Sequence, residues 1–177
     1  ITKYNTKLRD DQCSYIDRSE WTAIKKKKKI EYNNVTYEEY EKTETAYVKS
    51  ILVIINEKKI KSLKINSLHI INLNENIKNN YRFKNLILDF DSDARYLKED
   101  MEIEFDKLDK IIRLILREVI HAVLIGDNIE IKFGYDYYMY VNCEKLKSST
   151  IEFIEKAGLF VEPGTGPIEY SFLYSNE

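Results

Sequence analysis

The chain has 177 residues, of which 44% are hydrophobic and 33% are charged. This composition is typical of a folded globular protein, and the length suits a single domain with its own core. The net charge of −2 excludes a general positive field that would attract nucleic acid. No apolar run approaches the roughly 20 residues that cross a bilayer, and no charged and apolar leader opens the chain, so we expect no membrane segment.

Two cysteines, Cys13 and Cys143, are the only ones in the sequence. They are too few for a disulfide framework, and neither belongs to a C-x-x-C pair. This pattern is typical of proteins from a reducing compartment. We therefore expect a cytoplasmic protein.

The first 20 residues are polar and show no clear periodicity. We expect an irregular arm at about 1–20 that contacts the domain through Tyr4, Leu8 and Tyr15. A short alternating segment at 30–32 then leads into a turn. The rest of the chain is predicted to form one domain, so the whole chain 1–177 is a single unit.

The first helix should begin at Thr36, because Thr36 and Glu39 match a capping box. Val35 and Tyr40 are placed to pack against each other across this start. Apolar residues then recur every three or four positions for about 20 residues, which is the period of a helix. Glu44 is the one polar residue in that stripe.

The middle of the chain is predicted to alternate between strands and a second long helix. Alternation predicts a strand at 63–71 that is buried at its end, and the Asn-rich stretch 72–80 reads as a loop. A short apolar run predicts a strand at 85–90. A wide apolar stripe predicts a largely buried helix over 103–124, which Gly126-Asp-Asn128 would stop.

The remaining segments are predicted to be mainly strands. Residues 129–133 and 137–142 should form a hairpin over Gly134-Tyr-Asp136. Ser149 and Glu152 match a second capping box, for a short helix that ends at Gly158.

Terminal strands are expected at 159–161 and 168–174. The helices and strands follow no regular βαβ rhythm. We therefore expect the α+β class, with a mainly antiparallel sheet packed by two long helices and one short helix.

The densest group of tyrosines is Phe133-Gly-Tyr-Asp-Tyr-Tyr-Met-Tyr-Val141. On a strand, one side of this run must pack on the second helix. The other side would carry Asp136, Tyr138 and Tyr140. Tyrosine rings beside a carboxylate suit a protein-binding surface, and they equally suit a packed core.

Carboxylates are concentrated between 89 and 109, and a second group lies on the first helix. Fixed carboxylates would complement the basic active site of a nuclease, although a solvated acidic surface gives the same pattern. The residues predicted to contact a partner are Glu38, Glu39, Glu41, Asp89, Asp91, Asp93, Glu102, Asp106, Tyr135, Asp136 and Tyr138.

Asp89, Asp91 and Asp93 follow an apolar run and could present carboxylates to a metal ion. This start is shared with haloacid dehalogenase phosphatases, but the rest of that pattern is missing. Ala94 also replaces the glycine that a calcium loop needs. A metal-dependent phosphohydrolase or nuclease is therefore the alternative function, and we predict no metal or cofactor in the preferred reading.

Glu118 and His121 are three residues apart on the predicted helix. A carboxylate-bridged iron site needs two copies of that spacing, and the chain has one. We therefore predict that Arg117, Glu118 and His121 form a structural polar cluster that satisfies polar groups under the hairpin. Acid–base chemistry by the same residues, in a protein that is itself a toxin, is a third reading.

Two segments carry a resemblance to a known class of proteins. The first is Leu116-Arg-Glu118 followed by Phe133-Gly-Tyr-Asp-Tyr-Tyr-Met-Tyr140, and the second is Thr36-Tyr-Glu-Glu-Tyr40 with Glu44-x-x-Tyr47. Together they resemble small bacterial immunity proteins of toxin–immunity systems. His121-Ala122 departs from it, because a bulkier aromatic is expected there. The resemblance implies a protein that binds and occludes a cognate toxin domain, such as a nuclease, without catalytic residues of its own.

Overall fold

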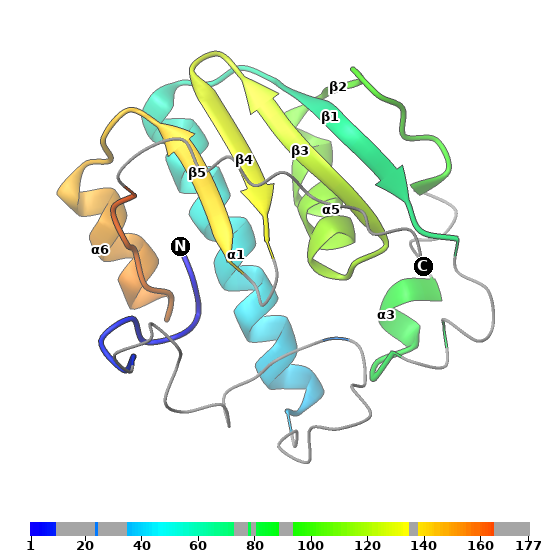
Figure 1. Cartoon of the computed structure of the whole chain (residues 1–177), viewed down its shortest axis with the longest axis horizontal. Coiled ribbons are helices and arrows are strands. Elements are labelled where there is room, and N and C mark those ends of the chain that lie inside the picture. Colours follow the sequence, from blue (N-terminus) through cyan, green and yellow to red (C-terminus); the bar gives the residue numbers. More distant parts are fainter. Residues whose placement is uncertain are drawn as a thin grey trace.

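The computed structural model describes residues 1–9, 24, 35–72, 78, 81–88, 94–134 and 138–164. In this part of the chain, five strands form one antiparallel sheet in the order β2-β1-β3-β4-β5 (Figure 1). The strands are β1 (Leu63–Ile70), β2 (Glu102–Ile103), β3 (Ile120–Gly126), β4 (Ile129–Phe133) and β5 (Met139–Cys143). The helices are α1 (Tyr37–Lys58), α3 (Asn85–Leu88), α5 (Phe105–Leu116) and α6 (Ser148–Lys156).

The sheet and the helices form two layers. In Figure 1, α1 and α5 cross behind the sheet, and α6 lies beside α1. Side chains of a strand point alternately to its two faces. On β3, Ile120 and Leu124 are accordingly buried while His121 and Ile125 are exposed. The predicted α+β class with an antiparallel sheet is confirmed.

Helix α1 begins where the sequence predicts. The N–H of Glu39 donates to the Thr36 hydroxyl at 3.2 Å, and the N–H of Thr36 donates to the Glu39 carboxylate at 2.8 Å. This reciprocal pair satisfies two backbone donors that the first helical turn leaves open. Tyr40 is buried, and Val35 packs against the same core.

Helices α1, α5 and α6 end in the same way, with a left-handed residue after the last turn. These residues are Lys59 with φ 55°, Glu118 with φ 54° and Gly158 with φ 92°. After each of them, the next N–H reaches back five residues: Ile60 to Ile55, Val119 to Leu114, and Leu159 to Ile154. This is the Schellman arrangement, which satisfies the last free carbonyls of a helix.

The helix predicted over 103–124 is wrong beyond Leu116. Helix α5 stops there, the chain reverses at Glu118, and the apolar residues from Ile120 onward form strand β3. The Gly126-Asp-Asn128 segment therefore closes a hairpin between β3 and β4 instead of ending a helix.

The strand predicted at 85–90 is also wrong, because Asn85–Leu88 forms the short helix α3. A short apolar run suits either structure, and its periodicity does not separate them. Strand β1 is confirmed, but the end that we expected to be buried is not. Its register shifts after Asn66, and both His69 and Ile70 are exposed.

The hairpin of β4 and β5 is confirmed, with pairs running from Ile129 and Cys143 to Phe133 and Met139. Helix α6 begins at Ser148, and no side chain of its own caps it, so the capping box predicted at Ser149 is wrong. The N–H of Lys147 instead donates to the Glu57 carboxylate at 3.2 Å. A carboxylate from α1 thus caps α6 and joins the two helices.

The beginning of the chain is attached to the far edge of the sheet. Thr2 forms an isolated bridge with Phe160, and the N–H of Met139 donates to the Ile1 carbonyl at 2.8 Å. Tyr4 is buried as predicted, whereas Leu8 is exposed. Residue 160 makes this single bridge rather than the strand predicted at 159–161. The predicted contact at Tyr15 and the predicted segments 30–32 and 168–174 lie outside the described residues.

Candidate binding surface

The first turns of α1 present an aromatic ring together with carboxylates. We define the α1 end as Tyr37, Glu38 and Glu41, all of which are exposed. The hydroxyl of Tyr37 lies 3.5 Å from the Glu41 carboxylate, and its ring stands edge-on to Phe83 at 5.6 Å. Glu39, also predicted to contact a partner, is exposed but holds the capping box.

The α1 end is held in place by an ion cluster one turn further along the helix. We define this ion cluster as Glu44, Asp109, Arg113 and Arg117. Arg117 donates from Nε and Nη2 to the two oxygens of Glu44, at 2.7 and 2.8 Å. Arg113 adds a bond of 2.6 Å to Glu44 and pairs with Asp109 at 2.8 Å.

The ion cluster pairs its charges with one another, and its Glu44–Arg117 pair lies inside the core. Glu44 and Arg117 are almost fully buried, and the Tyr40 hydroxyl donates to Glu44 at 3.3 Å. Burial lowers the pKa of Arg113, but its bonds to Asp109 and Glu44 outweigh that effect and raise it overall. Since buried charges need paired partners, this cluster fixes α1 to α5.

The expectation that Glu118 and His121 share one helical face is wrong, because α5 ends before both of them. Arg117 follows the last residue of α5 and donates to the Leu86 carbonyl at 2.8 Å in addition to Glu44. Glu118 occupies the left-handed position, where its carbonyl accepts a bond of 3.0 Å from the Tyr81 hydroxyl. His121 is an exposed residue of β3.

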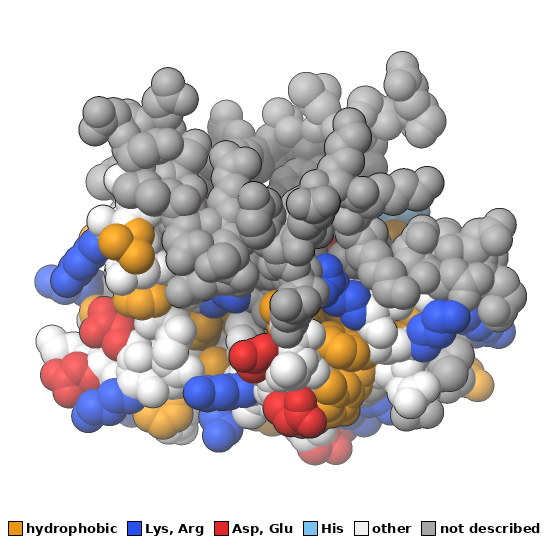
Figure 2. Space-filling view, turned by 90° about the horizontal axis from the view of Figure 1, so that it is seen from below, with side chains coloured by type: hydrophobic (Ala, Val, Ile, Leu, Met, Phe, Trp, Pro, Cys, Tyr) orange, Lys and Arg blue, Asp and Glu red, His pale blue; other side chains and the backbone are white. Residues whose placement is uncertain are grey.

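A groove of about 430 Å³ lies beside the α1 end, between α1 and α6. Its lining residues are Glu38, Glu41, Lys42, Thr45, Ala46, Lys49, Lys156 and Ala157. Figure 2 shows acidic, basic and apolar side chains interspersed on the described part of this side. The carboxylates of the α1 end therefore stand at the edge of a hollow and next to lysines.

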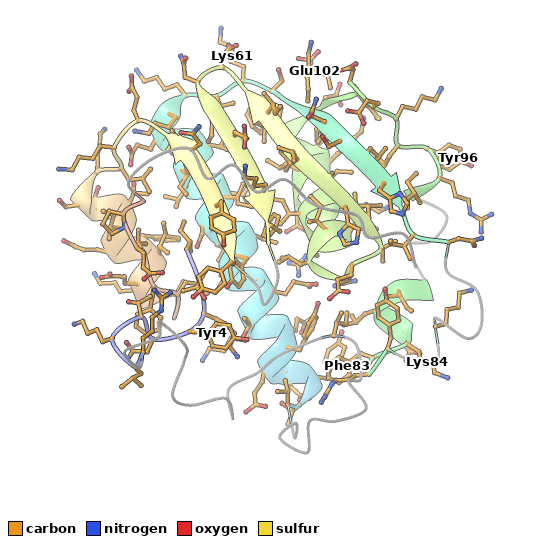
Figure 3. All side chains as sticks on the ribbon, in the orientation of Figure 1. Tyr4, Lys61, Phe83, Lys84, Tyr96 and Glu102 are labelled. Carbon is orange, nitrogen blue, oxygen red and sulfur yellow. The ribbon has the colours of Figure 1, made fainter. Side chains whose placement is uncertain are left out.

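The other acidic residues predicted to contact a partner lie elsewhere. Glu102 on β2 and Asp106 on α5 are exposed, and Figure 3 places Glu102 at the opposite end of the molecule from Phe83. Along its own helix, Glu38 lies six residues, about 9 Å, before Glu44, and Asp106 lies seven residues, about 10 Å, before Arg113, the partner of Glu44. The two acidic groups therefore do not form one surface.

Tyr138 directly precedes β5. Its ring stacks on Tyr140 with centroids 6.1 Å apart, and its hydroxyl accepts a bond of 2.6 Å from Arg9. Arg9 also pairs with Glu162 at 2.9 Å. Five further residues that were predicted to contact a partner or a metal lie outside the described residues: Asp89, Asp91, Asp93, Tyr135 and Asp136.

Two observations on the described residues bear on metal clusters and on a cysteine nucleophile. Among them, no three His, Cys, Asp or Glu side chains gather closely enough to hold a metal ion. Burial raises the pKa of the Cys143 thiol, which disfavours the reactive thiolate.

Two features of this structure were missed at the sequence level. Glu44 reads as an interruption of an apolar stripe, although it is the centre of a buried cluster. The two histidines, His69 and His121, are 52 positions apart, yet the sheet pairs them directly. The histidine pair could have been found only if β3 had been recognised as a strand. A histidine on a strand and one on a helix have no predictable spatial relation.

Comparison with protein-family models, with curated proteins and with solved structures finds no match to this chain. The resemblance to toxin–immunity proteins therefore stays a prediction. Within the described residues, none of the helices has the length and apolar character that crossing a membrane requires.

Proposed function

We propose that this protein is an immunity-type binding protein that occludes a cognate bacterial toxin domain in the cytoplasm, without chemistry of its own. The observation that carries the proposal is the α1 end, where Tyr37, Glu38 and Glu41 project from a helix fixed by the capping box and the ion cluster. An aromatic ring beside carboxylates on a rigid helix suits an interface, because little side-chain and backbone freedom is lost on binding.

The negative charge of the α1 end indicates the kind of partner that it would bind. A toxin that cuts nucleic acid carries a basic active site for phosphates, and fixed carboxylates complement such a surface. The α1 end would contact that basic surface, with the Tyr37 ring as its apolar anchor. The resemblance of Thr36-Tyr-Glu-Glu-Tyr40 to immunity proteins concerns the same residues.

The test uses the toxin domain encoded next to the gene of this protein. Binding is measured by calorimetry, and protection by co-expression. In a Glu38→Lys/Glu41→Lys variant we expect affinity to fall by about 100-fold or more, because two favourable charge contacts become repulsive.

The matched control is Glu152→Lys/Glu155→Lys, which makes the same charge change on exposed positions of α6. We expect this variant to bind within about threefold of the wild type. A neighbouring toxin that neither binds nor is neutralised would contradict the proposed function. Equal losses in both variants would instead place the interface away from the α1 end.

A further inference from the structure

The only two histidines of the chain stand directly opposite each other on neighbouring strands. His69 of β1 pairs with His121 of β3 in the antiparallel register. Both residues are exposed, and their rings are nearly parallel, with centroids 6.3 Å apart and an interplanar angle of 16°. Figure 1 shows β1 and β3 side by side, so the backbone places both rings on one face.

Directly opposed residues of an antiparallel pair have Cβ atoms about 5 Å apart. Two imidazoles bound to one tetrahedral ion, with metal–nitrogen bonds of about 2.1 Å, have donor atoms roughly 3.4 Å apart. Rotation about the side-chain bonds brings two such rings to this separation without movement of the strands. The pair is therefore spaced for chelation.

We propose that His69 and His121 form a bidentate site for a divalent late transition ion of the Zn²⁺, Ni²⁺ and Cu²⁺ class. Neutral imidazole is a preferred ligand of these ions, whereas Mg²⁺ and Ca²⁺ prefer oxygen. The described residues gather no third His, Cys, Asp or Glu with them, and water is able to complete the coordination of such an ion. A bound ion would join two strands that are distant in sequence and so stabilise the folded state.

The experiment measures Zn²⁺ binding to the full chain by calorimetry near pH 7.5. The parent protein and every variant carry Cys13→Ser and Cys143→Ser, so that thiols do not contribute to Zn²⁺ binding. We expect one ion per chain. His69→Gln and His121→Gln should each lower the affinity for Zn²⁺ by at least about tenfold. The double variant should bind Zn²⁺ no more weakly than either single variant.

This non-additive result separates a chelate from two independent histidines. If each single variant binds Zn²⁺ as tightly as the parent, or if the two losses simply add, the shared site is refuted. Mg²⁺ is the negative control for ion class. A second readout is thermal: Zn²⁺ should raise the Tm of the parent and leave the Tm of both single variants unchanged. Circular dichroism without metal checks that the variants fold, and none of these outcomes depends on a toxin partner.

Discussion

At the scale of single residues, the most consequential side chain is Glu44. Its carboxylate accepts bonds from Arg113, Arg117 and the Tyr40 hydroxyl inside the core. Burying charges is costly, and such a pair adds little net stability compared with well-packed apolar residues. Removing only one partner is different, because an unpaired charge is then left in the core.

We therefore predict that Glu44→Gln lowers the free energy of unfolding by about 3–5 kcal/mol, since Arg117 stays buried without a counter-charge. Urea denaturation measures the effect. Glu41→Gln, which changes an exposed residue of the same helix, should cost less than about 0.5 kcal/mol.

A double variant tests the reason for that loss. Glu44→Leu/Arg117→Leu removes both fully buried charges, while Arg113 keeps its partner Asp109. It should be more stable than the Glu44→Leu single variant. A double variant whose loss equals the sum of the two single losses would show that the charges do not interact.

At the scale of elements, carboxylates from elsewhere in the chain satisfy backbone groups that local residues leave open. Glu57 of α1 caps the start of α6. In the same way, Glu99 accepts the N–H of Leu68 at 2.7 Å and also the N–H of Ser67, where the register of β1 shifts. Ser67 has φ 55°, so the carboxylate stabilises a strained turn of the strand.

The Glu57 contact predicts a pH dependence. Burial raises the pKa of Glu57, but bonds from Thr150, Lys58 and the Lys147 N–H outweigh it, so its pKa lies below the ordinary 4.5. A lowered pKa in the folded state adds stability above the unfolded pKa, and this is lost as the pH falls through the folded value.

We expect the wild type to exceed Glu57→Gln in Tm by a constant margin between about pH 6 and 8. The margin should shrink as the pH falls below about 5 and carboxylates of ordinary pKa begin to protonate. Melting curves across this range provide the measurement. A margin that grows on acidification would contradict the assigned direction.

The elements also show where sequence patterns are sufficient. Thr36 and Glu39 predict the start of α1 because a capping box is a local arrangement of neighbouring residues. The break between α5 and β3 is hidden, because Glu118 adopts a conformation that usually belongs to glycine. Without that glycine, the apolar residues on both sides merge into one apparent helix.

The same distinction between local patterns and long-range contacts applies to the candidate site. Exposure of Glu38 and Glu41 follows from helical periodicity alone, so the sequence predicts it correctly. The burial of Glu44 depends on Arg113 and Arg117, which come from a distant helix. The pairing of His69 with His121 depends on strand register, which no local pattern of either segment determines.

At the scale of the whole molecule, the beginning of the described chain closes the β5 edge of the sheet. Residues 1–9 lie against β5 and against the segment that follows α6. Thr2 and Phe160 exchange backbone bonds of 2.9 and 2.6 Å, and Thr2 and Tyr4 are buried there. The predicted arm is therefore part of the fold at its first residues.

This attachment predicts a local loss of protection when the segment is removed. Deleting residues 1–4 takes away the acceptors of the Met139 and Phe160 N–H groups and uncovers the space that Tyr4 fills. We expect these two amides to exchange with solvent at least about 100-fold faster, because each loses its partner and its cover. Hydrogen exchange followed by NMR gives the rates.

Amides in the centre of the sheet separate local from global effects. The N–H groups of Leu124 and Ile131 belong to the paired strands β3 and β4, inside the β5 edge of the sheet. Their exchange should become faster only as far as the overall stability falls. Arg9→Gln, which removes an ion pair that is partly exposed, should leave Met139 and Phe160 protected. Unchanged exchange at Met139 and Phe160 after the deletion would mean that the β5 edge is stable without the first residues. Their contacts would then cover the sheet edge without contributing to its cooperative stability.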